Sequence, residues 1–118
     1  MSKTSYVDIE DQVQLPDHGV IRAKLTIGNG QTGGHSVFLG NNLLGQDSEV
    51  EIGEAAGLKG KQLIATCTVV DTNADTNWTS FTLLLKQGGD DLKTFGPYSK
   101  KVDKDKDVVG YTLIIDLI

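Results

Sequence analysis

The sequence predicts an all-β protein: a single antiparallel β-sandwich of about seven or eight strands, spanning residues 1–118 as one domain. Short β-rich segments recur at a spacing of roughly ten residues, with turn signals between them. Glycine accounts for 14 of the 118 residues and proline for 2, which suits tight turns between many strands. No segment of about ten residues shows the apolar period of a helix.

The first third of the chain contains one clear strand. Residues 1–19 predict an N-terminal arm or an edge strand, followed by a turn at Pro16–Gly19. Residues 20–27 alternate apolar and polar side chains, which predicts a strand with one face in water. The glycine-rich segment 28–34 is then expected to be a loop.

Shorter segments follow. Residues 35–39 predict a short strand, 40–45 a second loop and 49–52 a further strand. Segment 53–61 is ambiguous, because glycines interrupt the helical tendency of its alanines. It permits at most one short helical turn near 53–59.

The centre of the chain gives the strongest strand signals. Residues 62–70 and 78–87 alternate clearly, and we expect them to form a hairpin closed by the polar loop 71–77. Residues 93–99 predict a short edge strand, because Pro97 cannot donate a hydrogen bond to a ladder.

The last predicted strand covers residues 107–117 and follows a charged loop at 100–107. Its main apolar residues share one face. Ile114 lies on the other face, which predicts that both faces of the sheet are partly covered.

Charge and cysteine content exclude several classes of function. With 11 Lys and Arg against 16 Asp and Glu, the net charge is −5, which disfavours nucleic acids and anionic membranes as partners. The lone Cys67 excludes an internal disulfide and a cysteine-based zinc cluster. The sequence starts without the apolar core of a secretory signal, so a cytoplasmic location is expected.

One glycine motif resembles a nucleotide-binding pattern by its letters alone. Residues 28–33 match G-x-G-x-x-G and follow a strand. A dinucleotide site needs a helix that opens at the third glycine, so that its N-terminus meets the pyrophosphate. The residues that follow do not begin a helix, so we interpret the segment as a glycine-rich loop.

Two acidic segments raise the hypothesis of a calcium site. Alternate oxygen-bearing side chains within a loop can converge on a hard cation. Such side chains occur at Asp71, Asn73 and Asp75, and again at Asp103, Asp105 and Asp107. The alternative is a pair of solvated turns, which the lysines interleaved with the second segment favour.

The direction of the predicted strands places these loops. Because successive antiparallel strands reverse direction, loops 71–77 and 100–107 should lie at one end of the sandwich. Loop 40–47 should join them there with Asn41 and Asn42 as binding residues. Trp78 starts a strand beside the first loop. It is either a buried anchor or an exposed residue that binds a protein or stacks on a sugar.

No catalytic constellation is visible. His18 and His35 lie in loop-like contexts, and nothing in the sequence pairs either with a nucleophile. Cys67 lies on an apolar alternating face, which predicts an inert buried thiol.

The sequence therefore predicts a non-catalytic module for protein–protein interaction or assembly. It would bind a protein partner, or a second copy of itself, through polar loops or sheet edges. The N-terminal arm and the strand that contains Pro97 are the candidate edges. The alternative is a calcium-dependent domain that binds a ligand, such as a carbohydrate, at the acidic loop end.

Overall fold

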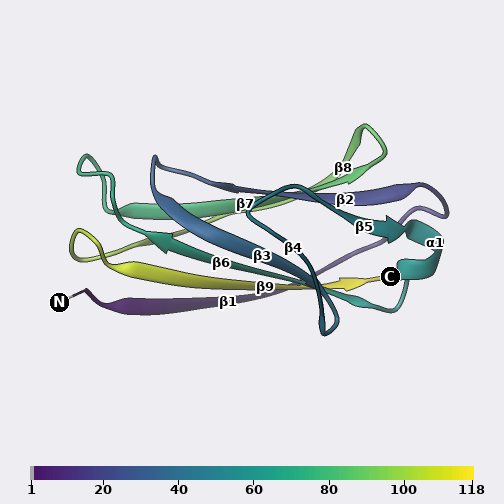
Figure 1. Ribbon diagram of the computed structural model, residues 1–118, viewed down its shortest axis with the longest axis horizontal. Coiled ribbons are helices and arrows are strands. Elements are labelled where there is room, and N and C mark those ends of the chain that lie inside the picture. The colour runs from purple at the N-terminus through teal and green to yellow at the C-terminus, as the bar shows by residue number, and fades with distance from the viewer. Residues whose placement is uncertain (1) are drawn as a thin grey trace.

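The computed structural model describes residues 2–118 and shows two β-sheets packed face to face (Figure 1), confirming the predicted all-β sandwich. One sheet has five strands in the order β1-β9-β6-β3-β4, and the other has four in the order β5-β2-β7-β8. The strands are β1 (Thr4–Val13), β2 (Val20–Ile27), β3 (Thr32–Leu39), β4 (Asn42–Gln46), β5 (Val50–Glu54), β6 (Gln62–Val70), β7 (Trp78–Gln87), β8 (Asp90–Lys101) and β9 (Val108–Leu117).

Alternation along the strands builds the core between the sheets. In β6 the buried positions are Leu63, Ala65, Cys67 and Val69, the face that alternation predicts. Tyr111 of β9 and Phe81 of β7 meet across the core with ring centroids 4.8 Å apart. Burial of these apolar faces between the two layers is the main force that holds the sandwich together.

Two expectations about strand pairing are wrong. Strands β6 and β7 do not form a hairpin, because β6 pairs with β3 and β9 whereas β7 pairs with β2 and β8. Loop 71–77 instead crosses from one sheet to the other. The sandwich is also not wholly antiparallel, since β1 runs parallel to β9 over its full length.

Two short elements complete the fold. Strand β4 occupies residues that the sequence predicts to be loop, so the sandwich has nine strands. Helix α1 (Ala55–Leu58) is the single turn expected near 53–59, and its buried Ala55 and Leu58 close one end of the core.

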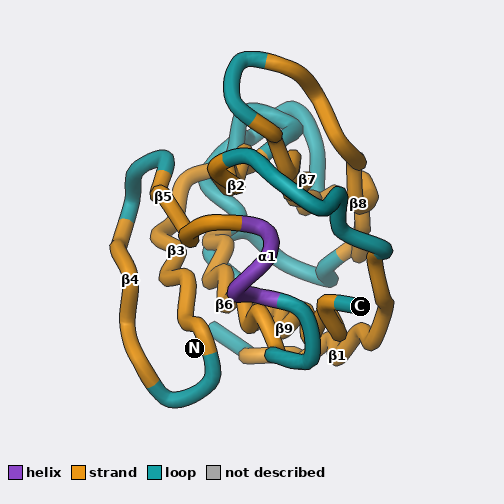
Figure 2. The backbone as a smooth tube through the Cα atoms, turned by 90° about the vertical axis from the view of Figure 1, so that its right-hand side faces the viewer, coloured by secondary structure: helices purple, strands orange, loops and turns teal. Residues whose placement is uncertain are grey.

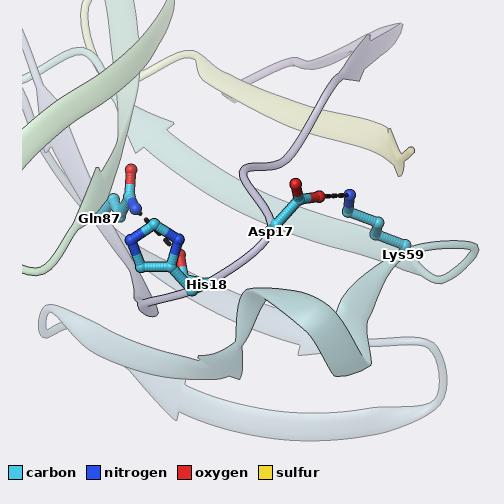
Figure 3. Close-up of polar contacts among 4 residues, drawn as sticks. All are labelled: Asp17, His18, Lys59 and Gln87. Atoms are coloured by element: carbon cyan, nitrogen blue, oxygen red, sulfur yellow. Dashed lines mark hydrogen bonds and ion pairs between the residues drawn. The ribbon is translucent and has the colours of Figure 1, made fainter.

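The connection between β1 and β2 is fastened to that end of the molecule. Lys59 Nζ lies 2.8 Å from Asp17 Oδ1, and Gln87 Nε2 donates to the backbone carbonyl of His18 at 2.9 Å (Figure 3). These contacts join the crossing segment to Lys59, which directly follows α1, and to Gln87 of β7. They fix the point at which the chain leaves the five-stranded sheet for the other layer.

The outer face of the five-stranded sheet carries a row of apolar side chains. Leu43 lies opposite Phe38, Phe38 opposite Ile64, and Ile64 opposite Ile114, so these four side chains cross the face in register. Leu43 is 51% exposed and the other three are half-buried. Ile114 is thus shielded by neighbouring strands of its own sheet, and no further strand or helix of residues 2–118 lies over it.

The molecule is elongated, measuring 47 × 25 × 20 Å. Strand β1 begins toward one end of its long axis and β9 ends toward the other (Figure 1). Viewed from the α1 end, β4 and β5 lie on one side of the sandwich and β1 and β8 on the other (Figure 2). Within residues 2–118, no helix has the length and apolar character needed to cross a membrane.

Candidate functional site

The two acidic loops meet at one end of the molecule, as strand direction predicts. The Asp71 N–H donates to the Asp107 carbonyl at 3.0 Å, and the Lys106 N–H donates to the Asp71 carbonyl at 2.7 Å. Loop 71–77 and the loop before β9 are therefore joined through their backbones.

Gln31 holds loop 71–77 in place, a role that sequence reasoning missed. Its Oε1 accepts hydrogen bonds from the backbone N–H groups of Thr72 (2.7 Å) and Asn73 (2.8 Å). Its Nε2 lies 2.9 Å from Asp71 Oδ1, and it also reaches the carbonyls of Thr76 and Trp78. Gln31 follows the tight turn at Asn29 and Gly30, both with positive φ, and leads into β3. Residues 28–31 of the G-x-G-x-x-G segment thus form the expected turn, whereas residues 32–34, which were expected to be loop, belong to β3.

The two buried carboxylates at this end accept hydrogen bonds from the protein. Asp107 Oδ1 accepts from the Lys3 N–H at 2.9 Å, and Oδ2 accepts from the Lys104 N–H at 3.2 Å. These donors, the Lys3 N–H first, hold the pKa of Asp107 below its ordinary value. Asp71 Oδ1 accepts from Gln31, while Asp71 Oδ2 is buried without a hydrogen-bond partner among the described atoms.

The other predicted calcium ligands are more open to solvent. Asp75, Asp103 and Asp105 are exposed. The Asn73 side chain donates a hydrogen bond to the Asn29 carbonyl and accepts one from the Asp75 N–H. Among residues 2–118, no three acidic, histidine or cysteine side chains are grouped so that they could hold a metal ion.

The predicted position of Asn41 and Asn42 is wrong, whereas their role as binding residues stays a prediction. They lie at the β3–β4 turn, at the end opposite the acidic loops, beside Gly60, Lys61 and Asp116. The reason is the unrecognised strand β4, which adds one reversal of direction between β3 and β5. This extra reversal moves the turn to the other end of the sandwich.

Trp78 is a surface residue and not a buried anchor, since 47% of it is exposed. It lies beside the acidic loops, and a shallow hollow next to it is lined by Asn29, Ser80, Pro97 and Ser99. The binding role of Trp78 stays a prediction.

The register places His35 directly opposite Cys67, a pairing that the sequence did not suggest. The backbone N–H of His35 donates to Asp47 Oδ1 at 2.8 Å. Burial raises the pKa of the Cys67 thiol to about 12, and nearby Asp47 adds to the rise. The thiol is therefore protonated at neutral pH, and this group of residues supplies no thiolate nucleophile.

Strand β1 is the one long, regular edge of the five-stranded sheet. Parallel pairing aligns Thr4 with Val108 and Val13 with Leu117. In such a ladder each residue turns both its N–H and its C=O to the same side, and successive residues alternate sides. Lys3 and Val13 carbonyls accept from Val108 and Ile118, so the odd-numbered residues face β9.

The even-numbered residues of β1 therefore present their backbone groups to the free side. Thr4, Tyr6, Asp8 and Glu10 turn N–H and C=O groups away from β9, where no other strand of residues 2–118 pairs with them. Their side chains are exposed on the outer face of the sheet, and Tyr6 is 77% exposed. We call the segment Thr4–Glu10 the open edge.

The open edge stops at Gln12, where side chains satisfy the free backbone groups. The Gln12 N–H donates to Asp11 Oδ1 at 2.8 Å, and Lys93 Nζ of β8 donates to the Gln12 carbonyl at 3.1 Å. Lys93 of β8 thus links the four-stranded sheet to β1 of the five-stranded sheet. The two strands lie on the same side of the sandwich (Figure 2).

The other three edge strands are protected in ways that natural sheets use against unwanted pairing. Strands β4 and β5 are short, and a register shift interrupts the pairing of each. Strand β8 is long, but two register shifts and Pro97 break its regularity. The open edge of β1 has neither a bulge nor a proline.

Comparison of the chain with models of protein families, with curated proteins and with solved structures finds no match, so the geometry of the open edge and of the acidic loops carries the functional argument.

Proposed function

We propose that this chain is a non-catalytic protein-binding module that takes an extended segment of a partner protein along β1. The open edge of Thr4–Glu10 is the observation that supports it. An added strand would pair with the free N–H and C=O groups of four residues, Thr4, Tyr6, Asp8 and Glu10. Main-chain hydrogen bonds give affinity in this mode of recognition, and alternate side chains give specificity.

A different chain is a better partner for this edge than a second copy. Two β1 strands paired antiparallel about a two-fold axis would gather Asp8 and Glu10 of both copies on one face. Like charges on neighbouring strands destabilise such pairing. The net charge of −5 on each copy adds to the repulsion.

The alternation of backbone direction along β1 supplies the test. In Asp8→Pro the lost N–H is one that points to the free side, so the β1–β9 ladder keeps its hydrogen bonds. In Val7→Pro the lost N–H is one that faces β9. We expect Asp8→Pro to melt close to the wild-type chain and Val7→Pro to melt clearly lower.

Binding is then measured with a phage-displayed library of random peptides selected on the wild-type chain. We expect the enriched peptides to lose at least about tenfold in affinity for Asp8→Pro, since proline removes a hydrogen bond and blocks the edge. Asp8→Asn is the matched control, because it removes the same charge and keeps the N–H. The proposal fails if no peptide is enriched, or if the enriched peptides bind Asp8→Pro as well as Asp8→Asn.

A further inference from the structure

We infer that the segment bound at β1 alternates basic with apolar side chains. This inference rests on strand addition at the open edge and specifies the chemistry of the partner. A strand added to a sheet continues both of its faces, so the side chains of the partner would lie beside the two faces of β1.

The outer face calls for basic side chains. Asp8 and Glu10 point outward from the middle of the open edge and are exposed. None of the outward positions on the neighbouring strands β9, β6 and β3 is Lys or Arg. These positions are Val108, Gly110, Thr112, Ile114 and Asp116 on β9; Gln62, Ile64, Thr66, Thr68 and Val70 on β6; and Thr32, Gly34, Ser36 and Phe38 on β3. The two carboxylates thus have no cation on their own face of these strands, and a lysine or arginine on the adjacent strand would supply one.

The inner face calls for apolar side chains. Val7 and Ile9 alternate with the acidic residues, and both are half-buried against the core. Tyr98 and Leu92 of β8 are also half-buried against the core. Strand β8 lies on the same side of the sandwich as β1 (Figure 2). Apolar side chains of an added strand would extend this layer, whereas charged ones would lose hydration there.

Lys93 limits the basic stretch. It donates to the Gln12 carbonyl and lies 4.0 Å from Asp11 Oδ1, so a cation already stands at that end of the strand. A further basic residue in the partner would meet like charge beyond Glu10. The basic positions of the partner are therefore those beside Asp8 and Glu10.

Three synthetic peptides test this chemistry. The basic peptide is Lys-Val-Lys-Val-Lys-Val-Lys, and the acidic peptide replaces each Lys with Glu. The third, Lys-Lys-Lys-Lys-Val-Val-Val, keeps the composition of the basic peptide without its alternation. Affinity is measured by titration, and the amide signals of Thr4–Glu10 in an isotope-labelled NMR spectrum report whether the peptide lies along β1.

We expect the basic peptide to bind about tenfold more tightly than the acidic one, with shifts at the open edge and a loss of affinity at high salt. The preference for the basic over the acidic peptide should vanish in the double variant Asp8→Asn, Glu10→Gln. It should persist in the matched control Glu51→Gln with Glu54→Gln, which removes two charges from β5, at the far edge of the other sheet.

The possible failures are distinct. Equal binding of basic and acidic peptides that is lost in Asp8→Pro would overturn the charge preference and leave strand addition standing. Equal binding of the alternating and non-alternating basic peptides would mean that an acidic protein attracts any basic peptide. This outcome would overturn the inference. If none of the peptides shifts the amides of Thr4–Glu10, the inferred basic and apolar chemistry is contradicted, and the library selection on Asp8→Pro and Asp8→Asn decides whether strand addition stands.

Discussion

Gln31 is a single side chain that connects three parts of the acidic loop end. Its amide bonds to the backbone at Thr72 and Asn73, and to the Asp71 carboxylate, from a position that is 7% exposed. Replacing it with leucine leaves those partners without their hydrogen bonds. We expect Gln31→Leu to lower the free energy of unfolding by about 2 kcal/mol, as measured by urea denaturation.

Gln46→Leu is the matched control for that change. Gln46 is exposed and makes one long side-chain hydrogen bond, to Ser36 at 3.2 Å, so its loss should cost no more than about 0.5 kcal/mol. A loss of stability in Gln31→Leu that does not exceed the loss in Gln46→Leu would show that the amide does not hold the loop.

Cys67 makes a second prediction at this scale. The pKa of about 12 that burial gives its thiol leaves very little thiolate at neutral pH. We expect Ellman's reagent to leave the native chain unmodified and to react rapidly once urea unfolds it. Because Cys67 is the only cysteine, the absorbance reports on this residue alone. Reaction of the folded chain at the rate of a free thiol would show that the core opens at β6.

Residues could be predicted from the sequence where their role depends on near neighbours. The inward position of Cys67 follows from alternation within β6. The role of Gln31 could not be found in this way, because its partners lie 40 to 47 positions away along the chain. The pairing of His35 with Cys67 likewise depends on the register between β3 and β6, which no local pattern specifies.

Among the elements, long alternating strands were predicted well and short ones were not. The bounds expected for β6 and β7 agree with the structure. Buried and more exposed positions alternate along all of β6 and along β7 from Phe81 to Lys86, which leaves few other conformations. Strand β4 has only five residues, its pairing contains a register shift, and its apolar Leu43 is exposed, so no alternation of apolar and polar residues marks it as a strand. Its residues were therefore predicted to be a loop. Strand pairing depends on contacts between strands far apart in the sequence, which no local pattern specifies. For this reason β6 and β7 were wrongly expected to form a hairpin.

The loop before β9 makes a prediction about pH. The Asp107 carboxylate ties this loop to the start of the chain through the Lys3 N–H, and its pKa is lowered mainly by that hydrogen bond. A carboxylate with a lowered pKa stabilises the fold above its ordinary value of about 3.9, and the contribution is lost as the pH falls through the folded-state pKa. We expect Asp107→Asn to melt below the wild type at about pH 7, with the gap shrinking toward about pH 3.

Asp105→Asn controls for the general loss of one negative charge. Asp105 is exposed on the same loop, so its removal should produce little change at either pH. A gap for Asp107→Asn that stays constant with pH would mean that the charge of the carboxylate is not what stabilises the loop.

At the scale of the whole molecule, the chain passes repeatedly from one sheet to the other, and the direction of each strand determines at which end the next loop lies. Strand direction alone places the loops 71–77 and 100–107 together, and the structure agrees. The same reasoning failed for Asn41 and Asn42 because one missed strand inverts the direction of everything on its far side. The open edge could not be predicted from local sequence patterns. It depends on the position of β1 at the edge of its sheet and on the parallel register of β1 with β9.

The parallel pairing of β1 with β9 also has a mechanical consequence. The chain enters β1 at one end of the 47 Å axis and leaves β9 at the other (Figure 1). Tension between the two ends pulls these neighbouring strands in opposite directions along their length. The evenly spaced hydrogen bonds of the ladder then carry the load together, in shear, instead of breaking one after another as in a peeled hairpin. The resistance of this fold to being pulled apart is therefore concentrated in its first and last strands.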